Sequence, residues 1–171
     1  MQDDIDDGVK WLVTRGLVDP KRVCIMGASF GGYAAEWGAV RNPDIYRCAI
    51  SLAGVSDIAA QLKYDRKSFV AARYYRNWRD RVQGSNSIDL DSISPAKRAA
   101  DLKVPILIAH GDADTNVPPI QSKMLVDALT KLGRPPEYYV YKREGHGFTK
   151  PEDQIDFLKK VEAFLAKYNP A

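Results

Sequence analysis

A serine between two glycines, at a predicted strand-to-helix junction, is the feature that most constrains this chain. The apolar run 22–26 predicts a short buried strand, and residues 32–40 predict a helix. Between them, the sequence Gly-Ala-Ser-Phe-Gly at 27–31 fits the G-x-S-x-G pattern of a nucleophile elbow. In such a tight turn, Ser29 exposes its hydroxyl at the carboxyl end of a sheet. The backbone N–H of Phe30 would then face a developing oxyanion.

The same pattern also fits a tight turn with an ordinary serine, so the interpretation depends on partner residues. A serine nucleophile needs a base, and the base needs a carboxylate that holds its tautomer. In this kind of fold the carboxylate and then the histidine follow the serine along the chain. Of the two histidines, His146 lies late, in a glycine-flanked loop, and is the candidate base. The alternative is a surface-loop histidine. His110 precedes the acidic loop and is interpreted as structural.

The candidate carboxylates follow the predicted strand 104–109. Asp112 and Asp114 both lie in the loop after this strand. Asp112 could instead form a turn with its own backbone, a common role for aspartate in loops. Spacing alone does not choose between the two.

Three segments together resemble the catalytic domain of the prolyl oligopeptidase family of serine peptidases, which includes dipeptidyl peptidases and acylaminoacyl peptidases. They are residues 27–33, 110–118 and 144–148, which span most of the chain in the family's order. The resemblance implies that Asp114, three residues before Val117, is the catalytic aspartate.

The same resemblance implies roles in substrate binding. Asn116 is expected to help hold a substrate carbonyl, and Val117 to line the pocket for the residue before the scissile bond. Tyr33, at the end of the first matched segment, is also predicted to bind substrate.

Helix and strand patterns alternate along the whole chain and predict one domain over residues 1–171. Short apolar strands between helices favour an α/β fold, with a mostly parallel sheet and helices on both faces. With the resemblance, this predicts part of an α/β-hydrolase fold. The predicted strands are 22–26, 47–52, 104–109 and 137–141, and the predicted helices are 5–15, 32–41, 119–132 and 152–168.

The segment 55–98 is less regular and is predicted to be an insertion that forms part of the pocket and its cap. Its position after the second strand places it at the sheet end where Ser29 is expected. Tyr74, Tyr75 and Trp78 are candidates to line the pocket, with plain helix packing as the alternative. The arginines at 73, 76, 79 and 81 are predicted to form a solvated helix face.

Only one helix precedes the strand that leads to Ser29, so the early strands of an α/β-hydrolase have no counterpart here. The resemblance implies that the second oxyanion donor, a tyrosine, and a β-propeller would lie outside this chain. We therefore expect the chain alone to be weak or inactive and the parent protein to be active. Association with the N-terminal part, or with other copies, is a further expectation because half a sheet leaves a strand edge uncovered.

Composition excludes several classes of protein. The net charge of +3 comes from interspersed residues and forms no basic stripe, so no nucleic-acid partner is predicted. No apolar run approaches the roughly 18 residues of a membrane span, and the acidic N-terminus does not fit a signal peptide. Cys24 and Cys48 are predicted to be buried free thiols rather than a disulfide. No metal or cofactor is predicted, and the compartment stays open between cytoplasmic and periplasmic or secreted.

The sequence therefore predicts a serine-type exo- or oligopeptidase that acts on small peptides through an acyl-enzyme. A carboxylesterase with the same three groups is the first alternative, since fold does not fix the substrate. A catalytically inactive fragment or binding module is the second.

Overall fold

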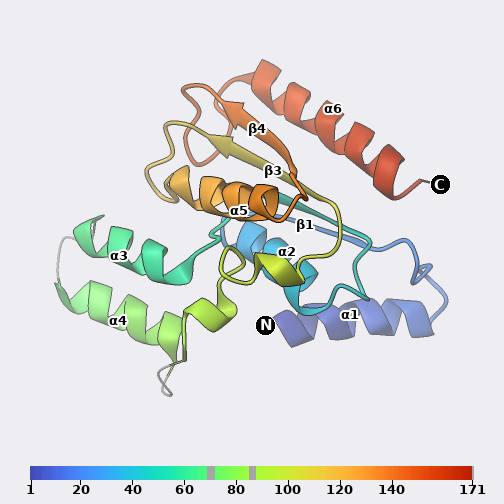
Figure 1. Ribbon diagram of the computed structural model, residues 1–171, viewed down its shortest axis with the longest axis horizontal. Coiled ribbons are helices and arrows are strands. Elements are labelled where there is room, and N and C mark those ends of the chain that lie inside the picture. The colour runs from blue at the N-terminus through green and yellow to red at the C-terminus, as the bar shows by residue number, and fades with distance from the viewer. Residues whose placement is uncertain (69–71, 85–87, 171) are drawn as a thin grey trace.

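The computed structural model of the chain describes residues 1–68, 72–84 and 88–170. Its centre is a four-stranded sheet in the order β1–β2–β3–β4, in which every neighbouring pair is parallel (Figure 1). The strands are β1 (Cys24–Ala28), β2 (Cys48–Leu52), β3 (Ile106–Gly111) and β4 (Glu137–Tyr141). β1 begins and ends two residues later than predicted, because Gly27 and Ala28 at the start of the elbow still pair with β2.

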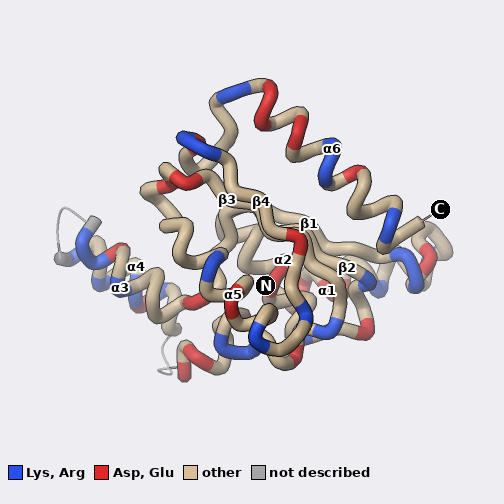
Figure 2. Tube along the Cα trace, turned by 45° about the horizontal axis from the view of Figure 1, so that its top comes forward, with Lys and Arg blue, Asp and Glu red and all other residues tan. Residues whose placement is uncertain are grey.

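Helices cover both faces of the sheet, as predicted. One face packs against α1 (Gln2–Thr14), α2 (Phe30–Arg41) and α5 (Ile120–Lys131), and the other against α6 (Pro151–Tyr168). Figure 1 shows α6 alone on its side of the sheet. Because the strands are mostly apolar and the charged residues lie mainly on helices and loops (Figure 2), the two faces of the sheet can both be buried.

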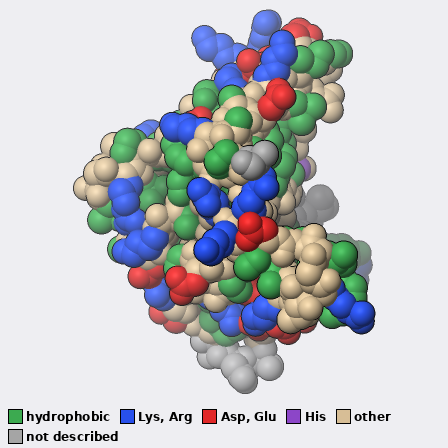
Figure 3. Space-filling view, turned by 90° about the vertical axis from the view of Figure 1, so that its right-hand side faces the viewer, with side chains coloured by type: hydrophobic (Ala, Val, Ile, Leu, Met, Phe, Trp, Pro, Cys, Tyr) green, Lys and Arg blue, Asp and Glu red, His purple; other side chains and the backbone are tan. Residues whose placement is uncertain are grey.

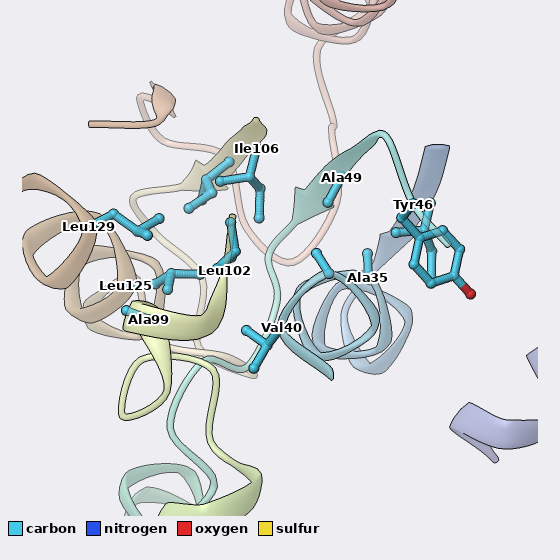
Figure 4. Packing of buried hydrophobic residues seen from close by; sticks show 12 residues of the cluster. Ala35, Val40, Tyr46, Ala49, Ala99, Leu102, Ile106, Leu125 and Leu129 are labelled. Atoms are coloured by element: carbon cyan, nitrogen blue, oxygen red, sulfur yellow. The ribbon is translucent and has the colours of Figure 1, made fainter. Parts of the chain in front are cut away.

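Two apolar clusters fill the space on either side of the sheet. The first lies between the sheet, α2 and α5; Figure 4 shows Leu125 and Leu129 of α5 near Ile106 of β3. Small residues of this cluster, such as Ala35 on α2 and Ala49 on β2, let the helix approach the strand closely. The second joins the other face to α6 through residues that include Ile50, Leu107, Phe157 and Phe164.

The segment between β2 and β3 forms a smaller helical layer of its own. It contains α3 (Ile58–Ser68), α4 (Ala72–Gln83) and the short 3₁₀ turns η1 (Asp91–Ile93) and η2 (Ala99–Asp101). A third apolar cluster, which includes Val55, Ile58 and Leu62, joins this layer to Tyr33 and Val117. Residues 69–71 and 85–87 of the predicted pocket segment lie outside the described residues.

Charge is distributed without a dominant sign on the surface in view in Figure 3, where basic side chains lie next to acidic ones. Within the described residues, none of the helices combines the length and the apolar character needed to cross a membrane.

The prediction of two free cysteines is wrong, because Cys24 and Cys48 form a disulfide. The two residues lie directly opposite each other in the β1–β2 register, with their Cα atoms 4.7 Å apart. The sequence predicted both strands but not that these two positions face each other, and only that register brings the sulfur atoms together.

A carboxylate lies in the core between α2 and β2. Glu36 is fully buried and accepts hydrogen bonds from the hydroxyls of Ser51 and Ser56, each at 2.7 Å. Burial raises the pKa of Glu36 to about 7, although the two hydroxyls act in the opposite direction. The carboxyl group is therefore easier to protonate in the folded protein than in the unfolded chain.

This burial predicts a pH-dependent stability. Because the folded pKa lies above 4.5, the usual value of a glutamate, the contribution of Glu36 is complete below pH 4.5 and is lost as the pH rises through about 7. Glu36→Gln keeps the shape and should remove this loss, which amounts to about 3 kcal/mol at 1.36 kcal/mol per pKa unit. Urea unfolding of both proteins at pH 5 and pH 8 measures it; equal pH dependence in the two would contradict the assignment.

The disulfide predicts a redox-dependent stability. It closes a loop with a sequence separation of 24 residues, for which the chain-entropy model gives about 3 kcal/mol. The free energy of unfolding in urea should fall by about this amount when a reductant is added and thiol titration shows two free cysteines. The double variant Cys24→Ala, Cys48→Ala should give the same stability with and without reductant. An unchanged midpoint for the reduced wild type would refute the prediction.

Candidate active site

Ser29 lies between β1 and α2 with a backbone conformation that non-glycine residues rarely adopt. Its φ is 58° and its ψ is −122°. Such strain persists only where the surroundings fix the backbone, and it is typical of functional sites. The Ser29 N–H donates to the Leu52 carbonyl at 2.9 Å, which ties the turn to the end of β2.

The glycines around Ser29 are required by close backbone contacts. A Cβ atom on Gly27 would lie 2.1 Å from the carbonyl oxygen of Gly31. A Cβ atom on Gly32 would lie 2.8 Å from the Cα of Gly54, in the loop after β2. Because Gly27 has no side chain, the chain can turn sharply around Ser29. Because Gly32 has none, α2 can pack against the loop after β2, and the two glycines together fix the position of Ser29.

The structure brings Ser29, His146 and Asp114 into one line of hydrogen bonds. His146 Nε2 lies 2.7 Å from Ser29 Oγ, and His146 Nδ1 lies 2.7 Å from Asp114 Oδ2. An ionised carboxylate can only accept, so Nδ1 carries the proton and donates to Asp114. Nε2 is then free to accept from the Ser29 hydroxyl.

Asp114 is fixed by its own loop. Its side chain is fully buried, and its Oδ1 accepts the N–H groups of Asn116 at 2.8 Å and Val117 at 3.0 Å. Asp112, the alternative that spacing left open, is exposed and accepts the Arg143 N–H at 2.5 Å. Only Asp114 therefore lies beside His146.

His110 is buried behind the Asp114 loop. Its Nδ1 lies 2.7 Å from Ser122 Oγ, and its Nε2 lies 2.9 Å from the Val117 carbonyl and 3.3 Å from Asp114 Oδ2. Burial lowers the pKa of His110 and outweighs the Val117 carbonyl and Asp114, which act in the opposite direction. A neutral His110 can donate from Nε2 and accept the Ser122 hydroxyl at Nδ1, which agrees with a structural role.

Glu144, which the sequence reasoning missed, holds the loop that carries His146. Its side chain is 1% exposed and accepts three hydrogen bonds, from the N–H and hydroxyl of Thr149 and from the N–H of Lys150. Burial opposes ionisation of Glu144, but these bonds from Thr149 and Lys150 outweigh it and lower its pKa to about 2. The Glu144 carbonyl also accepts the Ala113 N–H at 2.9 Å, which joins the His146 loop to the Asp114 loop.

The start of α6 explains why Glu144 fits there. The N-cap residue of α6, Lys150, makes no capping bond with its own side chain, so the N–H groups at this helix start need another acceptor. The sequence placed Glu144 in the segment 144–148 that resembles the family and shortly before a predicted helix start, but neither observation indicates which groups its side chain binds.

Phe30 is the first residue of α2, so its N–H is one of those that a helix start leaves without an intrahelical acceptor. This N–H directly follows Ser29 in the chain and is available to a charged oxygen beside the Ser29 hydroxyl.

A hollow of about 440 Å³ opens beside Ser29 and His146. It contains the predicted pocket residues Asn116 and Val117, and Trp78 from α4. Among the described residues, its lining does not include Tyr74 or Tyr75. The described residues that line the hollow are Ser29, Phe30, Val55, Gln61, Tyr64, Asp65, Trp78, Thr115, Asn116, Val117 and His146.

Tyr33, predicted to bind substrate, is 7% exposed and packs in the third apolar cluster. Its hydroxyl donates to the Ile93 carbonyl at 3.2 Å, and burial raises its pKa to about 12. Gln61, Tyr64 and Asp65 line the hollow but were not predicted, because nothing in the sequence shows which face of α3 the loop after β3 covers.

Within the described residues, no group of three or more histidine, cysteine, aspartate or glutamate side chains is arranged to hold a metal ion. The arrangement of His146 beside Asp114 and Ser29 allows proton transfer to and from the Ser29 hydroxyl.

Comparison with solved structures identifies the fold. The chain superposes on an acylaminoacyl peptidase from Pyrococcus horikoshii with a TM-score of 0.84 at 23% identity, covering 99% of this chain and 28% of that one. A puromycin-hydrolyzing peptidase from Mycobacterium tuberculosis gives 0.83 at 25% identity, covering 95% and 24%. The prediction of part of an α/β-hydrolase fold, with a parallel sheet between helices, is confirmed.

Sequence comparison identifies the family of the chain. A dipeptidyl aminopeptidase BIII from Pseudoxanthomonas mexicana is 33% identical over 172 residues, and the match covers 98% of this chain and 24% of the relative. Dipeptidyl peptidase family member 6 from Caenorhabditis elegans is 29% identical over 174 residues, covering 96% and 23%. The chain thus spans about a quarter of the length of these relatives. The family model for the prolyl oligopeptidase family matches residues 1–170, and the chain belongs to that family.

Proposed function

We propose that the protein is a serine peptidase that cleaves its substrate through an acyl-enzyme, with Ser29 as nucleophile. The observation that carries this proposal is the pair of 2.7 Å contacts that His146 makes with Ser29 and Asp114. A hydroxyl in such an arrangement can transfer its proton as it attacks a carbonyl carbon.

In the first step, Ser29 Oγ forms a bond to the carbonyl carbon while His146 Nε2 accepts the hydroxyl proton. The carbonyl oxygen becomes an oxyanion, and the Phe30 N–H can donate to it. When the intermediate collapses, His146 gives its proton to the leaving nitrogen and the carbon–nitrogen bond breaks. Water then attacks the acyl-enzyme with His146 again as base, which releases the acid and restores Ser29.

Asp114 has two tasks in this cycle. It keeps the proton of neutral His146 on Nδ1, so that Nε2 faces Ser29, and it stabilises the imidazolium that forms. The buried carboxylate is suited to both, since the N–H groups of Asn116 and Val117 hold its other oxygen in place. A fixed charge of this kind needs no reorganisation during the reaction.

The relatives indicate the substrate class. They carry the names of dipeptidyl aminopeptidase, acylaminoacyl peptidase and puromycin-hydrolyzing peptidase, each of which names a peptidase together with the group or compound on which that protein acts. We extend this class to the present protein and expect small peptides as substrates, with the hollow beside Ser29 holding one side chain.

The first test is covalent labelling of the chain and its Ser29→Ala variant by a fluorophosphonate, read by intact mass. We expect one adduct that forms slowly on the wild-type chain, because the second oxyanion donor is expected outside it, and none on the variant, because only the activated hydroxyl attacks the probe. Asp114→Asn should slow labelling by about 10⁴-fold, since it favours the wrong tautomer of His146. An adduct that persists in Ser29→Ala would refute the assignment of the nucleophile.

Hydrolysis of an aminoacyl anilide and of a simple aryl ester by the same protein separates a peptidase from an esterase. We expect Ser29-dependent cleavage of the anilide. Ester cleavage without any anilide cleavage would replace the peptidase with a carboxylesterase.

Glu144 should act as a positioning residue for His146. Glu144→Ala removes the acceptor for Thr149 and Lys150, and a displacement of the loop by about 1 Å would lower kcat by about 100-fold. Because no substrate contact is lost, KM should stay within a few-fold. Glu152→Gln, on the exposed start of α6, is the matched control and should keep the wild-type rate. A fall in kcat no larger than that of the control would show that Glu144 does not position His146.

A further inference from the structure

The hollow beside Ser29 contains a carboxylate that the proposed chemistry does not use. Asp65, on α3, accepts a hydrogen bond from Gln61 Nε2 at 2.8 Å and another from Trp78 Nε1 at 2.8 Å. Both donors are neutral, and among the described residues no lysine, arginine or histidine pairs with Asp65. The carboxylate is half-buried, and its charge has no partner in this part of the molecule.

The position of Asp65 relative to the candidate triad is fixed by contacts of α3 with the Asp114 loop. Gln61 Nε2 also donates to the Asn116 carbonyl at 3.0 Å, and the Tyr64 hydroxyl donates to the Thr115 carbonyl at 2.7 Å. Thr115 and Asn116 directly follow Asp114 in the chain. In Figure 1, α3 and α4 lie side by side, so Trp78 reaches Asp65 from the neighbouring helix.

The rest of the hollow has a different character. Its side chains include Val55, Tyr64, Trp78 and Val117, which together offer apolar and aromatic surface. Among the described lining residues, Asp65 is the only aspartate, glutamate, lysine or arginine. Such a site suits a ligand with a long aliphatic stem and a cationic end, because the stem packs on the apolar surface and the cation meets the carboxylate.

We propose that this hollow binds a lysine or arginine side chain of the substrate, at the position before the scissile bond, with Asp65 as its counter-ion. The proposal rests on the proposed function, which places the scissile carbonyl at Ser29. Trp78 contributes twice, since its indole N–H orients the carboxylate and its ring adds an aromatic surface beside a cation.

Other occupants fit less well. An acidic side chain would meet a like charge, and an apolar side chain would remove water from Asp65 without supplying a counter-ion. The remaining source of positive charge is the α-ammonium group of a substrate with a free amino terminus, so the experiment separates the two cations.

The kinetic test compares blocked peptide anilides that differ only in arginine or norleucine before the anilide. We expect the wild type to prefer arginine, and Asp65→Asn to lower the ratio of the two kcat/KM values by about 10-fold or more. Asp80→Asn removes the same charge from an exposed site on α4, outside the hollow, and should leave the ratio within about twofold. An unchanged ratio in Asp65→Asn would overturn the proposal.

A third substrate, with norleucine and a free amino terminus, tests the other cation. If its kcat/KM depended on Asp65 while the blocked arginine substrate did not, the carboxylate would recognise the amino terminus and the side-chain assignment would be wrong. Circular dichroism and thermal midpoints should show that both variants fold like the wild type.

A binding measurement separates this proposal from the catalytic one. In a Ser29→Ala background, isothermal titration calorimetry should show binding of acetyl-arginine amide that is stronger than that of acetyl-norleucine amide and is weakened by Asp65→Asn. This binding result, together with neither turnover of the anilides nor a fluorophosphonate adduct on the wild type, would support the pocket and refute the hydrolase. Turnover of both anilides with no Asp65-dependent binding or selectivity would refute the pocket and keep the hydrolase.

Discussion

The strained backbone of Ser29 is the constraint on which the rest of the site depends. A residue with φ of 58° at the end of a strand must be held from outside, and the structure holds it with the Leu52 carbonyl and the close packing of Gly27 and Gly32. These contacts need β1 and β2 in register and α2 close to the sheet. The small side chains between α2 and β2, and the buried hydrogen bonds of Glu36, serve that approach.

The parallel sheet explains how three distant residues meet. Ser29 follows β1, Asp114 follows β3 and His146 follows β4, and the carboxyl ends of parallel strands share one edge of the sheet. The shared edge of the sheet brings the three residues near one another. Hydrogen bonds between their side chains also require that the loops that carry Asp114 and His146 are held in fixed positions. The Asp114 loop is closed by its own N–H groups, and Glu144 ties the His146 loop to it and to the start of α6.

Much of this could be predicted from the sequence, because the elements are strongly patterned and the segments around Ser29, Asp114 and His146 are specific. What could not be predicted depends on which surfaces meet in three dimensions. Cys24 and Cys48 form a disulfide because the register of β1 and β2 places them opposite each other. The number of residues between two cysteines in the sequence does not indicate the register of the strands that contain them. Glu144 and Asp65 were missed for a similar reason, since each is a common residue type whose role comes from a helix start or helix face that another segment covers.

The hydrogen bond between Ser29 and His146 joins residues 117 positions apart in the chain. Closing a loop of this length costs conformational entropy, which the packing of the intervening strands and helices must offset before the contact can persist. In any state of the chain in which the His146 loop is not docked beside the elbow, Ser29 lacks the base that the proposed reaction requires. The proposed activity therefore depends on the integrity of the whole sheet from β1 to β4, so a change that undocks β4 would abolish it without touching Ser29.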